Sequence, residues 1–352
     1  MKLGIIINSY NNQKTILNAI NSISRIPNRK KIKIIVIDDS STDGSINVLR
    51  NEKKKKKIDL LYVNKKNIGI SRSRNIGINL CRNTDYITFL DGNDTLNPNF
   101  MSFFSKKIKK NSEDLILFNF SYSTEKEIKR NNFFSTNKIL RTKDMLNYFN
   151  KYLLAPNKNS LFTTCWSKLY RTKFILKKND QFKENLNLCE DTDFVFRYLN
   201  NNKVTRIKYF KFPMYNHSLS KGADNLKKLT FGININLKNQ ISFLEALKSC
   251  KKYLDKKILN KSQLNKKLNH CLGAYTSIYL IRSCLKINSI QSFLNVYFFW
   301  KKFLKKKVFF HALKDYSPKK AGGNIILNLF IKNKFYLISV IVAFLISKKR
   351  YL

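Results

Sequence analysis

Two adjacent carboxylates, Asp38 and Asp39, directly follow the apolar run Ile32–Ile37. A carboxylate at the end of a buried strand can accept hydrogen bonds from a nucleotide base or from ribose hydroxyls. The next residues, Ser40–Gly44, are typical of a turn and a helix start, with Asp43 as the expected N-cap. Turn chemistry accounts for that segment but not for the two carboxylates before it, so we interpret them as a nucleotide contact.

A second cluster of oxygen ligands, Asp91, Asn93 and Asp94, follows the apolar run Tyr86–Leu90. Carboxylate and amide oxygens at a strand end suit Mg²⁺ or Mn²⁺, which would bridge a diphosphate. The tetrapeptide Asp-Gly-Asn-Asp is also a good turn sequence when taken alone. We favour the metal site because this cluster would share an edge of the predicted sheet with the first carboxylate pair.

Charged residues near two predicted helix starts are further candidates for chemistry. Arg72 and Arg74 lie near the start of a helix expected over 71–81, where backbone amides also favour anions, so either could pair with phosphate. Exposed arginines on a capped helix are the alternative. Glu190 and Asp191 open a later helix, whose dipole stabilises an ionised carboxylate that could accept a proton from a hydroxyl.

Four further residues carry less specific signals. Asn8 and Tyr10 lie in the polar loop after the first apolar run, Leu3–Ile7. His217 is more typical of a surface or core histidine than of a metal ligand. Trp166 is more typical of packing, although a flat ring is also a common platform for the face of a sugar.

The elements that must position these residues alternate between strands and helices. Apolar runs predict strands at 3–7, 32–37, 59–63, 86–90, 115–120 and 203–209, and amphipathic stretches predict helices at 13–25, from 43, at 71–81 and from 191. The lysine-rich segment 52–57 is expected to be a solvated loop. Such strands and helices imply right-handed crossovers and a parallel sheet covered on both faces. Ligands then bind beyond the carboxyl ends of the strands, where the candidate residues lie.

The composition of the 352-residue chain narrows its possible partners. It contains 68 Lys and Arg against 22 Asp and Glu, a formal net charge of +46, which favours anionic partners. The hydrophobic content of 43% provides a core and excludes a wholly disordered chain. Six scattered cysteines without a CxxC pair argue against a disulfide framework or a zinc ribbon and favour reduced thiols in the cytosol.

Signatures of several other protein classes are missing from the sequence. No GxGxxG follows the first apolar run, which argues against a dehydrogenase. No helix-turn-helix, zinc-finger or aromatic RNA-binding signature is present, so no specific nucleic acid is expected as a partner. The N-terminus does not resemble a signal peptide, and we therefore expect a cytoplasmic protein.

Two late segments are predicted to contact a membrane. Residues 290–310 combine aromatic side chains with a lysine-rich flank, which is typical of an interfacial helix. Residues 335–347 are apolar and bounded by lysines, and a helix of that length spans about 20 Å, short of a hydrocarbon core of about 30 Å. We therefore expect this helix to lie in one leaflet, with burial in the protein's own C-terminal bundle as the alternative.

The order and spacing of these motifs resemble family 2 of the inverting glycosyltransferases, which have the GT-A nucleotide-sugar fold. The segments that carry the resemblance are Ile5–Asn11, Val36–Asp43, Asn67–Gly77, Tyr86–Asp94, Trp166–Tyr170 and Glu190–Asp191. The resemblance implies an α/β fold over residues 1–220, with a mostly parallel sheet flanked by helices, and a basic helical extension over 221–352. Residues 1–100 would bind the nucleotide and residues 101–220 the acceptor.

The resemblance also implies roles for residues at the nucleotide end of the site. Asp39, together with Asn8 and Tyr10, would hold the nucleotide base and the ribose. Asp38 and Arg74 are further nucleotide-binding candidates.

Other roles concern the metal and the reaction. Asp91 begins the position of the family's D-x-D metal motif, and Asp191 matches its catalytic base. Asn93 departs from the motif, because the family usually has Asp there. Its amide oxygen can still ligate Mg²⁺ or Mn²⁺ but brings one charge less, and Asp94 would compensate.

The implied activity is transfer of a sugar, with inversion, from a nucleotide-diphosphate donor such as a UDP-sugar to a hydroxyl of a growing cell-surface glycan, for example lipooligosaccharide or capsule. Its partners would be a glycan or lipid-linked acceptor and an anionic membrane surface, at the inner face of the plasma membrane. A non-catalytic basic protein that binds nucleic acid or glycan is the alternative. The sequence indicates neither the donor sugar nor an oligomeric state.

Overall fold

The structure, a computed structural model, describes residues 1–24, 31–108, 112–123, 128–186, 188–201, 204–218, 239–255 and 260–351. The chain packs into two compact units. The first comprises Met1–Arg141, Leu161–Leu186 and Glu190–Leu219, and the second comprises Thr142–Ser160, Asn187–Cys189 and Ser220–Leu352. The domain boundary predicted at residue 220 lies outside the described residues. The segment 142–160, which the sequence predicts to be part of the first domain, packs instead with the helices of the second unit.

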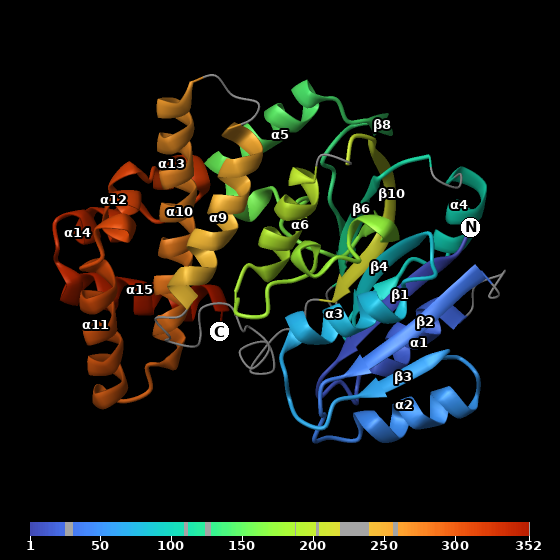
Figure 1. Ribbon diagram of the computed structural model, residues 1–352. Coiled ribbons are helices and arrows are strands. Elements are labelled where there is room, and N and C mark those ends of the chain that lie inside the picture. The colour runs from blue at the N-terminus through green and yellow to red at the C-terminus, as the bar shows by residue number, and fades with distance from the viewer. Residues whose placement is uncertain are drawn as a thin grey trace. The chain divides into compact units, whose positions relative to one another are not determined.

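A mixed sheet, with ten strands among the described residues, forms the centre of the first unit (Figure 1). The strands are β1 (Leu3–Ser9), β2 (Ile32–Asp38), β3 (Leu60–Val63), β4 (Tyr86–Asp91), β5 (Thr95–Leu96), β6 (Leu115–Ser123), β7 (Ile128–Arg130), β8 (Lys138–Ile139), β9 (Lys168–Arg171) and β10 (Ile207–Ser218). Their order is β3-β2-β1-β4-β9-β6-β10-β5, with β7 beside β6 and β8 beside β10. β1 to β4 run parallel, and β9 inserts antiparallel between β4 and β6.

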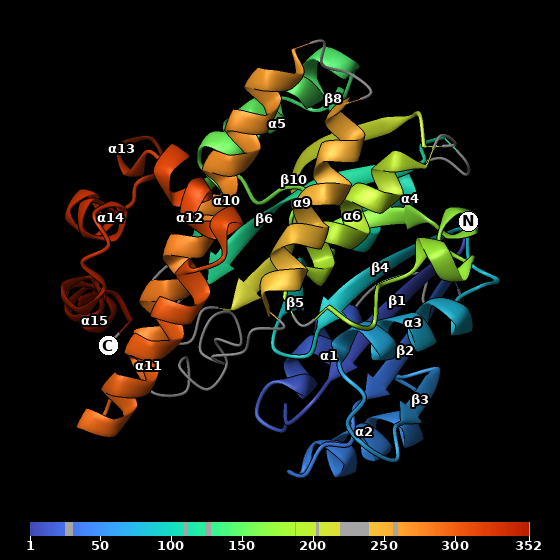
Figure 2. The ribbon, with the colours of Figure 1, turned by 60° about the vertical axis from the view of Figure 1, so that its left-hand side comes forward.

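Helices cover both faces of this sheet (Figure 2). They are α1 (Ile16–Ser24), α2 (Ser45–Lys54), α3 (Ile70–Leu80), α4 (Phe100–Lys107) and α6 (Glu190–Asn200). The connections through α1 and α2 move along the sheet in one direction, and α3 leads back past β1 to β4. Because such crossovers are right-handed, α1 and α2 lie on one face and α3 on the other. The apolar runs of β1 and β2 are thus buried from both sides, as predicted; Ile6 and Ile35 are 0% exposed.

The parallel register brings the polar residues after the strands to one edge of the sheet. Ser9 of β1 pairs with Asp38 of β2, and Asn8 of β1 pairs with Asp91 of β4. The carboxyl ends of three strands therefore meet where the sequence predicts a ligand site.

The segment Glu52–Lys57 is not the solvated loop that the sequence predicts. α2 continues to Lys54, and the Glu52 carboxylate is buried and pairs with Lys55 at 2.9 Å and with Lys57 at 2.7 Å. A buried carboxylate requires such partners. The hydrogen bond from Lys57 lowers the pKa of Glu52, and Lys55 adds to this effect.

Two smaller differences concern where elements begin. The N-cap of α2 is Gly44 rather than Asp43, whose carboxylate accepts a hydrogen bond from the Ser45 backbone at 2.9 Å. The strand predicted at 203–209 is β10, which begins at Ile207; residue 203 lies outside the described part of the chain. The other predicted strands and helices of the first unit are confirmed within a few residues.

The second unit is helical. Its helices are α5 (Thr142–Leu154), α9 (Asn239–Asp255), α10 (Lys261–Ser283), α11 (Ile290–Leu304), α12 (Lys307–Asp315), α13 (Pro318–Ala321), α14 (Ile325–Lys332) and α15 (Tyr336–Tyr351). α10 packs against α5, α9, α12 and α15. Gly273 permits the close approach of α10 and α12, since a Cβ there would lie 2.4 Å from the carbonyl oxygen of Ala312. Within the described ranges, no helix is both long and apolar enough to cross a membrane.

The two late segments that the sequence assigns to a membrane surface differ in burial. Residues 290–310 form α11 and the start of α12, and four of their eight aromatic side chains are buried, whereas Phe298 is 58% exposed. Trp300 and Phe303 are 0% exposed, and the Trp300 indole donates to the Ser283 hydroxyl at 3.0 Å. This corrects the prediction of an interfacial aromatic face for those side chains, because they pack within the unit.

Residues 335–347 lie mainly in α15, and one face of that helix packs in the helical unit. Val340 and Ala343 are 0% exposed. The alternative prediction, burial in the C-terminal bundle, is confirmed for that face. The opposite face is exposed to the outside of the unit.

Candidate functional site

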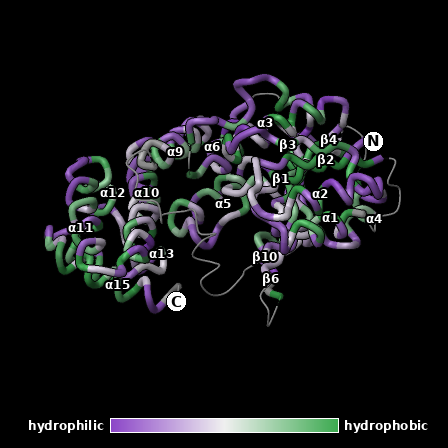
Figure 3. The backbone as a smooth tube through the Cα atoms, turned by 90° about the horizontal axis from the view of Figure 1, so that it is seen from below, coloured by the Kyte–Doolittle hydropathy of each residue, from purple (hydrophilic) through white to green (hydrophobic). Residues whose placement is uncertain are grey.

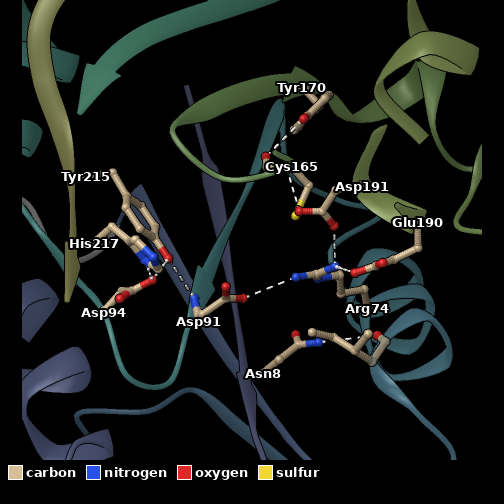
Figure 4. Close-up of polar contacts among 11 residues, drawn as sticks. Asn8, Arg74, Asp91, Asp94, Cys165, Tyr170, Glu190, Asp191, Tyr215 and His217 are labelled. Carbon is tan, nitrogen blue, oxygen red and sulfur yellow. Dashed lines mark hydrogen bonds and ion pairs between the residues drawn. The ribbon is translucent and has the colours of Figure 1, made fainter. Parts of the chain in front are cut away.

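A buried arginine connects three carboxylates that are far apart in the sequence (Figure 4). Arg74 donates through Nη1 to Asp191 at 2.5 Å and to Glu190 at 3.3 Å, and through Nη2 to Asp91 at 3.2 Å. Its side chain is only 2% exposed. A guanidinium at such depth requires carboxylates that neutralise it. The residues predicted as metal ligand, base and phosphate ligand therefore meet at one place.

Three elements position these side chains. Asp91 ends β4, Arg74 lies in the second turn of α3, and the acidic pair 190–191 forms the first turn of α6. α3 lies close to β1 because Gly77 faces it; a Cβ there would come within 2.4 Å of Ile6. The close helix–strand packing holds the guanidinium against the end of the sheet.

The clustered charges shift the pKa values of their neighbours. Burial and the charge of Asp191 raise the pKa of Glu190 to about 7. Burial also raises the pKa of Asp91, although Arg74 opposes the effect. Burial disfavours the charged form of Arg74, but Asp191 and the other carboxylates raise its pKa well above the ordinary value. The guanidinium thus stays charged while one neighbouring acid exchanges its proton near neutral pH, a pattern typical of functional sites.

The loop before β9 holds Asp191 from its other side. The backbone N–H of Cys165 donates to Asp191 Oδ2 at 3.0 Å, and the Tyr170 hydroxyl donates to the Cys165 carbonyl at 2.9 Å. Lys168 donates to a hydroxyl and a carbonyl of the same loop, each at 3.1 Å. Burial lowers the pKa of Lys168 to about 7. Both oxygens of Asp191 are therefore fixed, one by Arg74 and one by this loop.

Asp39 organises the loop that leads into α3. Its carboxylate accepts hydrogen bonds from Asn64 Nδ2 at 2.8 Å and from the backbone N–H groups of Ile68 at 2.9 Å and Gly69 at 2.8 Å. Gly69 has φ +88°, a conformation that glycine adopts readily. Asp39 is only 5% exposed. The contact with base and ribose that the resemblance implies for Asp39 stays a prediction.

The other nucleotide-binding candidates lie at the same edge with different exposure. Asp38 is 0% exposed, and its oxygens accept from the Ser41 backbone at 2.8 Å and the Ser41 hydroxyl at 2.7 Å. This favours turn stabilisation over direct contact with a nucleotide. Tyr10 is 49% exposed. Asn8 donates to the Ile70 carbonyl at 3.5 Å, while its Oδ1 is buried without a hydrogen-bond partner in the described part of the chain.

Asp94 is bonded to β10 rather than to the acidic cluster around Arg74. Its carboxylate lies 2.6 Å from the Tyr215 hydroxyl and 3.0 Å from His217 Nδ1, and accepts from the Ser218 backbone at 2.8 Å. The side chain is 0% exposed. This arrangement argues against the compensating metal-ligand role expected for Asp94 beside Asn93, because the side chain is buried and both of its oxygens already have partners in β10.

An aromatic stack covers that hydrogen-bond network. The Trp166 ring lies parallel to Tyr215, with centroids 4.5 Å apart, and to His217, with centroids 5.4 Å apart. The structure thus favours the packing role of Trp166. Burial disfavours the charged form of His217, but the hydrogen bond with Asp94 and the nearby carboxylates raise its pKa. His217 is therefore part of the hydrogen-bond network around Asp94, a role that its sequence context did not indicate.

Arg72 takes no part in the acidic cluster. Its Nε donates to Glu184 at 2.7 Å, and both side chains are exposed. The structure therefore favours the alternative prediction for Arg72, an exposed arginine on a helix. Two positions along α3 separate it from Arg74, and that spacing turns the two side chains to different surroundings.

Asp91 and Asn93 are the residues that the sequence assigns to a divalent cation, and that assignment stays a prediction. Asp91 uses Oδ1 for Arg74 and is 26% exposed, and Asn93 is half-buried. No group of three His, Cys, Asp or Glu side chains that could hold a metal ion occurs among the described residues. Mg²⁺ often takes one or two carboxylates and completes its shell with substrate phosphates and water. The oxygens of Asp91 and Asn93 fit a cation bound in this way.

Three contributors to the site were not identified from the sequence. Lys168 could have been recognised from the sequence, because it is the single charged residue in the segment Trp166–Tyr170, which ends in an apolar strand. Tyr215 could have been recognised from its position two residues before His217, because side chains two residues apart in a strand lie on the same face of the sheet. The N–H of Cys165 leaves no signal, because any residue except proline would supply it.

Comparisons with known proteins agree with this geometry. Residues 4–176 match the model of Glycosyl transferase family 2. The cholesterol galactosyltransferase of Borreliella burgdorferi is 27% identical over 241 residues, 66% of this chain and 66% of that protein. The poly(ribitol-phosphate) beta-N-acetylglucosaminyltransferase TarS of Staphylococcus aureus is 25% identical over 208 residues, 58% of this chain but only 34% of TarS.

A solved structure has the same fold. The crystal structure of S. aureus TarS 1-349 in complex with UDP-GlcNAc matches with a TM-score of 0.54 at 19% identity, over 92% of this chain and 93% of that chain. Fold and comparisons together place the chain among the glycosyltransferases with GT-A architecture, and the fold class expected from the sequence is confirmed. Within that class, the segment 4–176 belongs to Glycosyl transferase family 2. This membership favours an enzyme over the non-catalytic binding protein considered as the alternative.

Proposed function

We propose that the chain transfers a sugar from a UDP-sugar to a hydroxyl of a growing cell-surface glycan and inverts the anomeric centre. The observation that carries the proposal is the convergence of Asp91, Glu190 and Asp191 on the guanidinium of Arg74. The name of TarS as a poly(ribitol-phosphate) beta-N-acetylglucosaminyltransferase and its complex with UDP-GlcNAc support a surface polymer as acceptor and UDP as the carrier.

Asp191 is the proposed general base. Arg74 and the Cys165 N–H hold its two oxygens, so the carboxylate is oriented before substrate arrives. The acceptor hydroxyl gives its proton to Asp191, and its oxygen forms a bond to the anomeric carbon from the face opposite the nucleotide. The bond from that carbon to the diphosphate oxygen breaks, and UDP leaves with the electron pair. Alignment of the three reacting groups supplies much of the rate enhancement.

Arg74 is a positioning residue in this proposal rather than the phosphate ligand that the sequence predicts. It ties the base to Asp91, which with Asn93 would hold Mg²⁺ or Mn²⁺. Such a cation, when bound, supplies positive charge that stabilises the leaving diphosphate. The Arg74 guanidinium lowers the electrostatic repulsion between the carboxylates around it, so that they remain close enough to act on one substrate.

The nucleotide would lie at the ends of β1 and β2. The exposed ring of Tyr10 offers a surface for the base, and the unpartnered Oδ1 of Asn8 offers an acceptor next to Asp91. Asp39 positions the loop before α3 at this end of the sheet, and we propose that it also contacts the nucleotide directly. Asp38 stabilises the turn after β2 through its hydrogen bonds with Ser41.

We also place the protein in the cytoplasm, at the inner face of the plasma membrane, with a glycan or lipid-linked acceptor and no specific nucleic acid as partner. The Borreliella relative is named a cholesterol galactosyltransferase, and this supports an acceptor that resides in a membrane. The lysine-rich helices of the second unit support an anionic surface as partner.

A panel of nucleotide sugars tests the proposal. The full chain is incubated with each sugar and Mg²⁺ or Mn²⁺, then with chelator, and release of the nucleoside diphosphate is measured. Asp191→Asn should lower the rate with the preferred donor by at least about 100-fold, since a general base contributes about 10²–10⁴-fold. Asp180→Asn, a carboxylate of the same unit outside the cluster, is the matched control. Equal rates for Asp191→Asn and the unchanged protein would remove Asp191 as the base.

A further inference from the structure

The C-terminal helix α15 leaves large apolar side chains on the outside of the second unit. Leu337 and Leu345 are 51% and 62% exposed, whereas Ser339, Ala343 and Ser347 face the interior together with Val340, each 0% exposed. A helix of a water-soluble protein normally turns its large apolar side chains toward the core and its polar ones toward solvent. α15 departs from this pattern over several turns, because it buries two serines while these two leucines are exposed.

The preceding helix α14 also leaves large apolar side chains exposed. Ile325, Ile326 and Leu329 are 57–62% exposed, whereas Leu327, Ile331 and the polar Asn328 are buried. α14 packs against α15, and both belong to the second unit. We call the exposed large apolar residues of these two helices, together with Phe335 directly before α15, the apolar face; they are Ile325, Ile326, Leu329, Phe335, Leu337, Ile338, Ile341 and Leu345.

Exposed large apolar side chains are concentrated at this end of the chain. Of the 19 found among the described residues, 12 lie between Ile290 and Leu345. Figure 3 shows the apolar stretches of α11 and α15 in green beside hydrophilic ones in purple. Single exposed apolar residues are ordinary, but a concentration of this kind marks an interaction surface.

Positive charge flanks the apolar face. From residue 316 to the end, the chain contains seven Lys and Arg and neither Asp nor Glu. Lys332 ends α14, Lys334 lies between α14 and α15, and Lys348 and Lys349 lie near the end of α15. Long lysine side chains at the ends of an apolar helix can reach lipid phosphates while the helix lies below them. Each lysine near an anionic surface adds a favourable electrostatic contribution to binding.

We propose that the apolar face of α14 and α15 docks into one leaflet of an anionic lipid bilayer, with the flanking lysines on the lipid phosphates. A second copy of this chain would also cover apolar side chains, but it would bring the same excess of positive charge to the contact. A bilayer with acidic headgroups complements both the apolar surface and its charge. This inference rests on the proposed membrane location, not on the proposed chemistry.

Vesicle binding by the full chain tests the inference. Cosedimentation is measured with vesicles of phosphatidylcholine alone and of phosphatidylcholine with phosphatidylglycerol, at low and high salt. The unchanged protein should bind the anionic vesicles at low salt. The triple variant L337S/I341S/L345S should bind at least tenfold more weakly, with unchanged release of nucleoside diphosphate from the donor. Its matched control, L17S/I128S/I139S, changes three exposed apolar residues of the first unit and should bind normally.

Each other result has a defined meaning. Equal binding by the α15 variant and the unchanged protein would overturn the proposal that the apolar face enters the bilayer, but it would leave the proposed membrane location intact. No vesicle binding by the unchanged protein would overturn both, and a dimer that the variant dissolves would assign the face to a second copy. If the triple variant unfolds, K332Q/K334Q/K348Q/K349Q replaces it. That variant should lose binding to anionic vesicles, and normal binding would count against the inference.

Discussion

The sheet of the first unit and the last two helices of the second unit differ in what they leave exposed. In the first unit, apolar strands such as β1 fill the interior, and the charged groups meet at one edge of the sheet around Arg74. In the second unit, α14 and α15 bury part of their apolar surface, at Leu327, Ile331 and Val340, but leave the apolar face outside. The edge of the sheet therefore marks the place of the chemistry in one unit, whereas the exposed apolar face marks a contact surface in the other.

Charge is divided in the same way. Residues 1–220 contain 18 of the 22 acidic residues, and the last 132 residues contain 27 Lys and Arg against only four acidic residues. In the first unit the carboxylates near the site have basic partners, as Arg74 and Asp191 illustrate. In the C-terminal region most of the positive charge has no acidic counterpart in the sequence, which leaves it available to an anionic surface.

The largest expected effect on stability comes from removing the arginine that the first unit buries. Arg74→Met leaves three carboxylates close together without their cation, and it should lower the free energy of unfolding by about 3–5 kcal/mol. The remaining acids would have raised pKa values, so the loss should be greater at pH 8 than at pH 5. Urea unfolding at both pH values measures it.

Arg72→Met is the control for this substitution, on the same helix. Because the Arg72–Glu184 pair is exposed, its removal should change the free energy of unfolding by less than about 1 kcal/mol. Similar losses for both variants would mean that the buried cluster is not a distinct feature of the first unit.

The burial pattern of α15 predicts that the helix tolerates substitution of its exposed apolar residues better than substitution of its buried small residues. Ala343→Leu places extra methyl groups in a packed interior and should destabilise by about 1–3 kcal/mol. Leu345→Ala removes an exposed side chain and should change the free energy of unfolding by less than about 0.5 kcal/mol. Thermal and urea unfolding measure both. A larger loss for Leu345→Ala than for Ala343→Leu would mean that α15 packs with its apolar side inward.

The last prediction concerns how stability depends on pH, through the buried lysine next to the loop that holds the proposed base. The pKa of Lys168 is about 7 in the folded chain against an ordinary value of 10.5, so between these values the unfolded chain binds the extra proton. This group therefore makes the folded chain more stable as pH rises from about 7 to 10.5.

Lys168→Met should flatten that part of the stability curve relative to the unchanged protein. Melting temperatures across the range, with Lys65→Met as an exposed control, measure the difference. Parallel curves for Lys168→Met and the unchanged protein would contradict the shifted pKa.

Much of the first unit could be predicted because its signals are local. The apolar runs that became β1, β2 and β4 specify buried strands, and parallel pairing then brings Asp38 and Asp91 to one edge. The aromatic segment of α11 was assigned to a membrane surface because composition does not reveal which neighbours cover it. Glu52 was assigned to a loop because its lysine partners resemble a solvated run.

The local sequence pattern was sufficient to predict the strands, the crossover helices and the edge of the sheet at which the carboxylates gather. Each of these features depends on residues that are close together in the sequence. Three features depend on tertiary packing: the position of Arg74 rather than Arg72 at the centre of the cluster, the contact of Asp94 with β10, and the side of α15 that is buried. Those outcomes depend on contacts between residues far apart in the sequence, such as Arg74 with Asp191, which are 117 positions apart. Burial, and with it the cost of an unpaired charge, exists only once those distant segments have come together.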